Sequence, residues 1–155
     1  MKKILLALSV FMALFAGDGC IKGTDCTNKT VQSEQSTIVA YAAANGISAT
    51  AHSSGMYYQV INPGSGPSPT MSSTVVVKYT GKLLDGTVFD TQTATSVTIA
   101  MNSVIPGWQL GLPLIQKGGS IKLIVPSSLG YGCTGFGIVP GNSILYFEID
   151  LLDVM

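Results

Sequence analysis

The single tryptophan of the chain ends the segment Val-Ile-Pro-Gly-Trp at residues 104–108, in which two branched aliphatic residues precede a turn. Pro106 fixes one backbone dihedral and Gly107 carries no side chain, so the indole of Trp108 can present a flat surface. The next residues, Gln109 to Ile115, predict a short helix that supports Trp108 from behind. This combination predicts the floor of an apolar pocket. The alternative is that Trp108 is simply the largest residue of an ordinary core.

Few other side chains have the type or spacing of reactive groups. His52 is the only histidine, and the three cysteines, Cys20, Cys26 and Cys133, share no spacing typical of metal ligands. Charged residues make up 10% of the chain, the basic residues are all lysine, and the formal net charge is zero. The composition therefore argues against a nucleic-acid surface and against electrostatic capture of a polyanion.

The first nineteen residues have the arrangement of an export signal. Lys2 and Lys3 precede an uncharged, largely apolar run over residues 4–16, which is too short to span a bilayer. We interpret residues 1–19 as a signal peptide that is later removed, which predicts an exported, periplasmic protein. A buried N-terminal helix is the alternative.

Cys20 follows this boundary directly, as the lipid-bearing cysteine does in bacterial lipoproteins. The junction resembles theirs imperfectly, since Gly17 stands where leucine is usual and Asp18 is an unusual neighbour. Cys20 is therefore a candidate lipid-attachment site, and this lipid would be the protein's only contact with a membrane. Lipidation would leave Cys26 and Cys133 as a pair, whereas an unmodified Cys20 could close a small loop with Cys26.

Two segments separate the signal from the rest of the chain. Residues 20–31 are polar, rich in Thr, Lys and Asn, and predict a tether without fixed structure. Within the next segment, 32–54, apolar residues recur at helical spacing before an Asn-Gly pair, which predicts one amphipathic helix from Gln32 to Asn45. This helix could pack on the domain or lie apart from it.

The remaining residues, 55–155, alternate short apolar runs with clusters of Gly, Pro, Asn and Asp, a pattern typical of strands and turns. In one of these runs, Val75, Val77 and Tyr79 share a face. The predicted strands are Met56–Ile61, Thr74–Leu84, Thr87–Asp90, Ser96–Met101, Ser120–Val125 and Ser143–Val154. Strands with one short central helix, and without alternating helix and strand units, predict an α+β domain whose antiparallel sheet wraps that helix.

Five motifs occur in this region in a fixed order. They are Val77-Lys78-Tyr79-Thr80-Gly81, Asp85-Gly86-Thr87-Val88-Phe89-Asp90, Val104-Ile105-Pro106-Gly107-Trp108, Leu129-Gly130-Tyr131-Gly132 and Ile138-Val139-Pro140, before a closing strand with Phe147. In order and spacing they resemble the FKBP-type peptidyl-prolyl cis-trans isomerases over residues 55–155. The resemblance implies a twisted antiparallel sheet half wrapped around one short helix, with a proline-binding pocket between the two.

The resemblance also implies roles for individual residues. Four positions match catalytic residues of the family: Tyr79, Phe89, Asp90 and Tyr131. Tyr79 is expected to hold Asp90 by a hydrogen bond, and the Tyr131 hydroxyl and the Ile105 N–H correspond to donors for carbonyls of the bound chain. The substrate-binding floor, walls and rim fall on Val97, Val104, Ile105, Trp108, Phe136, Ile138 and Phe147.

Two of these positions depart from the family's pattern. Val97 stands where many members carry a pocket-wall aromatic residue, and Phe136 lies near the place of a histidine, in a loop that is one residue short. Both departures concern the rim of the pocket more than its floor. We expect them to affect substrate preference and ligand affinity more than activity.

The implied activity is rotation of X-Pro peptide bonds in other exported chains as they fold. The barrier of about 18–20 kcal/mol arises because conjugation is lost in the twisted amide, so no covalent bond has to break. A dry pocket that binds the twisted form better than the planar one lowers this barrier without a metal or cofactor. The expected partners are proline-containing unfolded or extended polypeptides, and macrolide-type ligands of the family are further candidates.

A second class of function is a binding module of the same fold. Such a module would hold extended or unfolded chains with little catalysis, and the departures at Val97 and Phe136 motivate this alternative.

Overall fold

The computed structural model describes residues 26–155 of the chain. The predicted signal peptide at residues 1–19 and the candidate lipid site at Cys20 lie outside the described residues. Within residues 26–155, no helix has the length and apolar character needed to cross a membrane.

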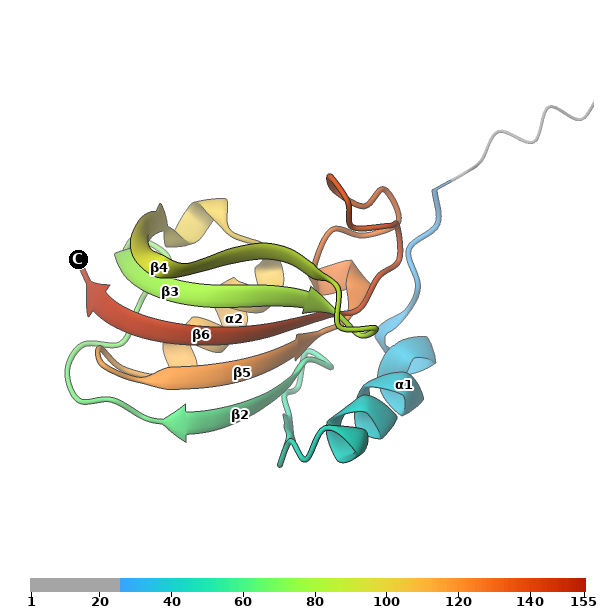
Figure 1. Ribbon diagram of the computed structural model, residues 1–155, viewed down its shortest axis with the longest axis horizontal. Coiled ribbons are helices and arrows are strands. Elements are labelled where there is room, and N and C mark those ends of the chain that lie inside the picture. The colour runs from blue at the N-terminus through green and yellow to red at the C-terminus, as the bar shows by residue number, and fades with distance from the viewer. Residues whose placement is uncertain (1–25) are drawn as a thin grey trace, which may run out of the picture.

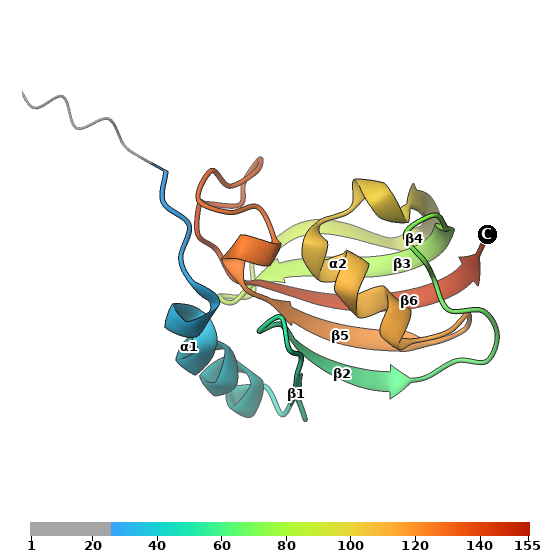
Figure 2. The ribbon, with the colours of Figure 1, turned by 180° about the vertical axis from the view of Figure 1, so that it is seen from behind.

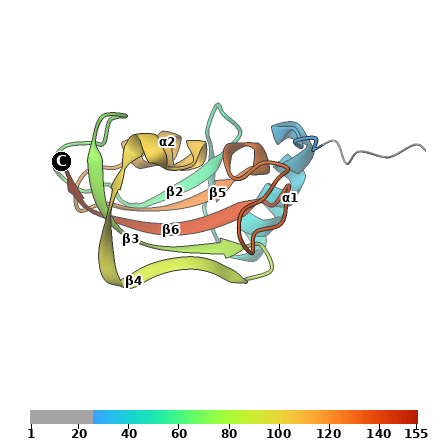
Figure 3. The ribbon, with the colours of Figure 1, turned by 90° about the horizontal axis from the view of Figure 1, so that it is seen from above.

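A six-stranded antiparallel sheet forms the framework of the described residues, with strand order β1-β2-β5-β6-β3-β4 (Figure 1). The strands are β1 (Thr50–Ala51), β2 (Tyr57–Asn62), β3 (Thr74–Leu83), β4 (Val88–Ala100), β5 (Ser120–Val125) and β6 (Leu145–Val154). Helix α2 (Pro106–Gly111) crosses one face of this sheet (Figure 2), and the sheet curves beneath it (Figure 3). This arrangement confirms the predicted α+β fold.

The two faces of the sheet bury different clusters, because side chains alternate along each strand. On β5, Leu123 belongs to the cluster beneath α2 and lies opposite Phe147 of β6. The next residue, Ile124, lies opposite Tyr146 and belongs to a second cluster on the other face. The alternating side chains of this strand therefore pack into two layers, one on each face of the sheet.

Helix α2 approaches the sheet closely because two of its residues, Gly107 and Gly111, carry no side chain. A Cβ atom at Gly107 would lie 2.5 Å from Cγ1 of Val125, and one at Gly111 would lie 2.7 Å from the Cδ atoms of Leu123. The helix begins at Pro106, a favourable first position because proline lacks the N–H that would remain unpaired there. Trp108 is thus a residue of the helix itself, which corrects the prediction that the helix starts at Gln109.

Helix α1 (Val31–Ala44) covers the other face of the sheet at one end (Figure 1). Its N-cap is Thr30, whose hydroxyl oxygen accepts a hydrogen bond from the Ser33 N–H at 3.3 Å. Ile38 and Ala42 are buried against the second cluster, which includes Ile124 and Tyr146. The predicted helix is therefore present within one residue of its predicted bounds, and it packs on the sheet.

The predicted strands at 87–90 and 96–101 form one continuous strand, β4. Its pairing with β3 continues across a bulge, since Val77 lies opposite Val97 whereas Tyr79 lies opposite Gln92. The extra residues on β4, at 93–96, are Ala94 and three hydroxyl residues, and their low apolar content separates the two predicted strands in the sequence. The long β3 provides hydrogen-bonding partners on both sides of the bulge, so the strand is not interrupted.

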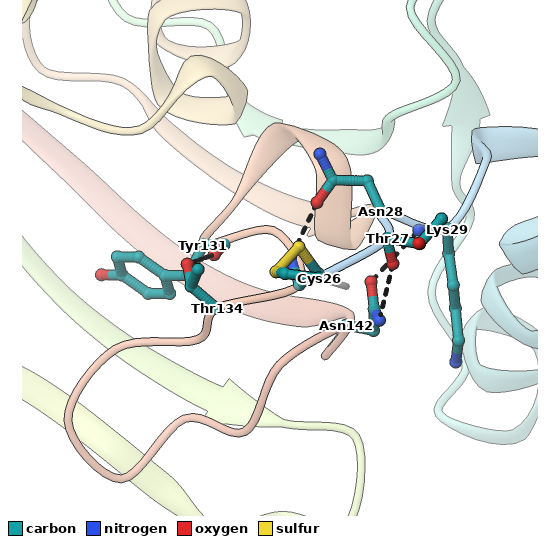
Figure 4. Close-up of a disulfide and its surroundings, with 8 residues drawn as sticks. Cys26, Thr27, Asn28, Lys29, Tyr131, Thr134 and Asn142 are labelled. Carbon is teal, nitrogen blue, oxygen red and sulfur yellow. Dashed lines mark hydrogen bonds between the residues drawn. A yellow bond between two sulfur atoms is a disulfide. The ribbon is translucent and has the colours of Figure 1, made fainter. Parts of the chain in front are cut away.

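Part of the predicted tether is fixed to the rest of the protein, which corrects the expectation for residues 26–31. Cys26 forms a disulfide with Cys133, with 5.4 Å between their Cα atoms. Of the two cysteine pairings that the sequence leaves open, the structure therefore contains the one between Cys26 and Cys133. Figure 4 shows the neighbouring residues Thr27 to Lys29 lying against the loop that carries Asn142.

We expect Gly107→Ala to destabilise the domain by about 1–3 kcal/mol, because Val125 is branched at Cβ and cannot easily move away from the added methyl group. Helix propensity alone predicts the opposite, a gain of up to about 1 kcal/mol. Urea unfolding followed by Trp108 fluorescence measures the change. Gly111→Ala is the matched control. It should lower the free energy of unfolding less, since the Leu123 side chain can rotate its Cδ atoms away from the added methyl group. A Gly107→Ala variant more stable than the parent would contradict the close contact.

Candidate active site

A cavity of about 380 Å³ opens between α2, the sheet and the loop that follows β5. Its lining is mainly apolar and aromatic. The lining residues are Tyr79, Asp90, Ile99, Ser103, Val104, Ile105, Trp108, Tyr131, Phe136 and Phe147. A small, largely apolar cavity with few polar groups is a typical binding site for an apolar group of a ligand.

Trp108 forms the floor of this cavity and is 4% exposed. Two rings meet it edge-on, Tyr79 with a centroid distance of 5.0 Å and Phe147 with 5.4 Å. The carbonyl oxygen of Ile105, three residues before Trp108, accepts hydrogen bonds from the N–H groups of Trp108 at 2.9 Å and Gln109 at 3.2 Å. The indole is therefore held by its own helix turn below and by aromatic edges at its sides.

Phe89 supports the wall from behind instead of lining the cavity. Its ring lies edge-on to Phe147 at 5.6 Å and to Tyr131 at 6.4 Å. Gly81 makes this packing possible, since a Cβ atom there would lie 2.7 Å from the Phe89 ring and 3.0 Å from the Phe147 ring. Any larger residue at position 81 would displace both rings.

The polar part of the cavity is formed by Tyr79 and Asp90. The Tyr79 hydroxyl donates a hydrogen bond of 2.5 Å to Asp90 Oδ2, as expected from the sequence. The strand register explains the contact, because Asp90 lies opposite Gly81, two residues after Tyr79. Burial, and then the hydrogen bond to Asp90, raise the pKa of Tyr79 well above its ordinary value, so this hydroxyl stays protonated near neutral pH.

Tyr131 and Phe136 form the rim of the cavity. Their rings stack with a centroid distance of 5.3 Å, and Phe136 is 69% exposed. Burial raises the pKa of Tyr131, and the negative charge of Asp90 raises it further. The Tyr131 hydroxyl therefore remains a hydrogen-bond donor at the edge of an apolar cavity.

The structure brings together most of the residues that the sequence assigns to the site, and it places three of them elsewhere. Phe89 lies behind the wall, Ile138 is 65% exposed on the loop, and Val97 packs against the core without lining the cavity. Val97 is smaller than the aromatic residue expected there, and Ile99, two residues further along β4, lines the cavity instead. Strand alternation from Val97 would have indicated Ile99, whereas no sequence signal indicated Ser103.

Among residues 26–155, no group of three or more His, Cys, Asp or Glu side chains is arranged to hold a metal ion.

Comparisons with known proteins identify relatives for most of the chain. Residues 66–152 match the sequence profile of the FKBP-type peptidyl-prolyl cis-trans isomerases. The FKBP-type peptidyl-prolyl cis-trans isomerase FkpA of Escherichia coli (strain K12) is 46% identical over 104 residues, which make up 66% of this chain and 38% of that relative. The chain thus spans only about two fifths of the length of this relative.

Solved structures show the same similarity in three dimensions. The crystal structure of FkpA from Escherichia coli matches with a TM-score of 0.71 and 38% sequence identity, covering 80% of this chain and 60% of that one. A peptidyl-prolyl cis-trans isomerase from Pseudomonas syringae matches with a TM-score of 0.68 and 29% identity, covering 83% of this chain and 98% of that one.

The raised pKa of Tyr79 predicts how stability depends on pH. The folded state holds this proton more tightly than the unfolded state, so the contribution is fully present below about pH 10 and is lost as the pH rises further. Tyr79→Phe should therefore lose less stability than the parent between about pH 10 and about pH 11. Urea unfolding at each pH measures the free energy of unfolding. The lysines titrate in both proteins alike, so they do not contribute to the difference between parent and variant. Identical slopes for parent and variant would show that Tyr79 does not titrate in this way.

Proposed function

The chain belongs to the FKBP-type peptidyl-prolyl cis-trans isomerase family, and on this premise we propose that it accelerates the rotation of X-Pro bonds in exported polypeptides while they fold. The observation that carries this proposal is the aromatic cup around Trp108, with Tyr79 and Phe147 edge-on to the indole and Asp90 held at its edge by Tyr79. A proline ring is compact and apolar, and such a cup accepts it without requiring a polar partner for the ring itself.

The reaction needs differential binding of two conformations of the same bond. Uncatalysed prolyl isomerisation takes tens to hundreds of seconds, because the twisted amide has lost its conjugation. The twisted amide is also less charge-separated than the planar one, so removing water from its carbonyl favours it. A preference of about 4 kcal/mol for the twisted form would increase the rate roughly a thousandfold. Shape and desolvation in the cavity are sufficient sources for this preference.

The polar groups at the edge of the cavity orient the substrate in this proposal. The Tyr131 hydroxyl and the Ile105 N–H donate hydrogen bonds to carbonyl groups of the bound chain. The carboxylate of Asp90 faces the reacting amide and is oriented by Tyr79. The pKa of Tyr131 is raised, which supports its role as a donor at neutral pH.

One observation favours a second candidate function, a module that holds unfolded chains with little catalysis. Phe136 and Ile138 are 69% and 65% exposed on one loop beside the cavity. Exposed apolar side chains at a rim can bind extended apolar segments whether or not a proline occupies the cavity. Only the isomerase predicts a refolding rate for a proline-limited client that increases in proportion to the concentration of this protein.

The predicted export of the protein is part of the proposal. The disulfide between Cys26 and Cys133 supports an oxidising compartment such as the periplasm, since disulfides rarely persist in the cytosol. We also propose that Cys20 carries a lipid. If it occurs, the intact mass of the mature protein increases accordingly and Cys20→Ser moves the protein into the soluble fraction. A soluble parent with unmodified Cys20 would refute lipidation and leave export intact.

Replacing Asp90 with Leu or Phe89 with Ala should lower kcat/KM by about tenfold or more while the domain stays folded, because each change disturbs the orientation of the bound amide. A protease-coupled assay of a proline peptide measures the rate. Asp150→Leu makes the same substitution at an exposed aspartate, whose neighbours Ile149 and Leu151 point into the cluster beneath α2. The kcat/KM of this control should therefore equal that of the parent. Unchanged rates in the Asp90 and Phe89 variants would mean that catalysis occurs elsewhere.

The rim predicts a preference for an apolar residue before the proline. Phe136 and Ile138 offer no compensation for the desolvation of an acidic side chain. In a peptide series that varies only this residue, Leu should therefore be isomerised faster than Glu, and Phe136→Ser should reduce the difference. Ile61→Ser, which changes an exposed apolar residue on β2, should leave it unchanged. A preference of the parent for Glu over Leu would refute this prediction.

A further inference from the structure

The chain reaches α1 by passing along the loop that carries the rim of the cavity. Figures 1 and 2 both show residues 26–30 running beside the loop between η3 (Ser127–Leu129) and β6 before the first turn of α1. These residues and α1 precede the segment that matches the family profile, which begins at residue 66. Contacts from this segment to the rim therefore come from residues that precede the matched sequence profile.

Glu34, in the first turn of α1, makes one of these contacts and is only 2% exposed. Its Oε2 accepts a hydrogen bond of 2.8 Å from the N–H of Ser127, a residue that is fully buried. Within residues 26–155, Glu34 Oε1 and Ser127 Oγ have no hydrogen-bond partner. A buried carboxyl group with a hydrogen-bond partner at only one oxygen gains little net stability, since the cost of burying the other oxygen opposes the gain. Its clearest effect is to fix the position of the Ser127 backbone.

Ser127 in turn holds the backbone on both sides of Tyr131. Its carbonyl oxygen accepts hydrogen bonds from the Gly130 N–H at 3.1 Å and from the Gly132 N–H at 2.8 Å. Tyr131 lies between these two glycines, so its backbone position depends on the position of Ser127. The route from Glu34 to the Tyr131 ring thus consists of one side-chain hydrogen bond and two backbone hydrogen bonds.

The residues before α1 hold the far side of the same loop. Asn28 Oδ1 accepts a hydrogen bond of 2.8 Å from the Cys133 N–H, and Cys133 is also joined to Cys26 by the disulfide. Asn142 Oδ1 accepts one of 3.1 Å from the Lys29 N–H. In Figure 4 the Tyr131 side chain points away from these contacts, so they act on its backbone and leave the ring free to face the cavity.

We infer that residues 26–34 are a positioning element for Tyr131, and that Glu34 is its principal residue. This inference rests on the proposed isomerase function, in which the Tyr131 hydroxyl orients the substrate. Glu34 does not touch the cavity and acts only through Ser127. The rim of the site is thus held in part by residues that precede the matched sequence profile.

The test compares two substitutions of similar size at Glu34. Glu34→Gln keeps an acceptor for the Ser127 N–H, whereas Glu34→Met removes it. We expect kcat/KM to fall roughly tenfold in Glu34→Met and to remain near the parent value in Glu34→Gln. Ile38→Ala is the matched control, since it weakens the packing of α1 without a contact to Ser127, and its kcat/KM should stay near the parent value. Asn28→Ala, at an exposed position, should lower kcat/KM about threefold. This variant tests the same positioning element if Glu34→Met does not fold.

A double-mutant cycle with Tyr131→Phe shows whether the effect passes through the Tyr131 hydroxyl. In the Tyr131→Phe background, Glu34→Met should cause little further loss. Additive losses, or equal losses in Glu34→Met and Ile38→Ala, would overturn the inference while leaving the proposed function intact.

Amide hydrogen exchange tests the positioning independently of activity. The amides of Gly130 and Gly132 should exchange faster in Glu34→Met than in Glu34→Gln or Ile38→Ala. This readout applies even if the parent does not accelerate isomerisation, a result that would refute the proposed function alone. Unchanged exchange in Glu34→Met would refute the positioning role.

Discussion

The close contact between α2 and β5 is the constraint on which the candidate site depends. Gly107 and Gly111 bring the helix against Val125 and Leu123, closer than any residue with a Cβ atom could approach without displacing them. This places Trp108 directly beneath the aromatic edges of neighbouring strands. A helix further from the sheet would leave a wider and wetter cleft. The position of the cavity floor is therefore a consequence of helix–sheet packing.

The polar groups of the site are few, and the surrounding rings hold them in place. The hydrogen bond between Tyr79 and Asp90 depends on the register of β3 and β4. Gly81, which lies opposite Asp90, has no side chain and so leaves room for the Phe89 and Phe147 rings. For the proposed rotation of X-Pro bonds, such a site needs no reactive group, because rotation requires only that one amide conformation be bound better than another.

The N-terminal segment changes how the domain should be delimited. The family profile begins at residue 66, yet the rim loop is held by Cys26, Asn28 and Glu34, which precede it. The buried surface of α1 likewise packs on the sheet through Ile38. A description of the protein as a tether followed by an independent domain therefore omits contacts that reach the site.

Strand alternation, turn residues and the segment 104–108 are enough to predict the α+β class, five of the six strands and the apolar floor at Trp108. The hydrogen bond between Tyr79 and Asp90 was expected from the family resemblance. Tertiary structure alone decided which cysteines pair, the lining by Ile99 and Ser103 in place of Val97, and the contact of Glu34 with Ser127. These features join residues far apart in the chain, or depend on the size of a single side chain. Periodicity and local motifs do not predict such contacts, because the contacts form only when the strands, helices and loops pack together.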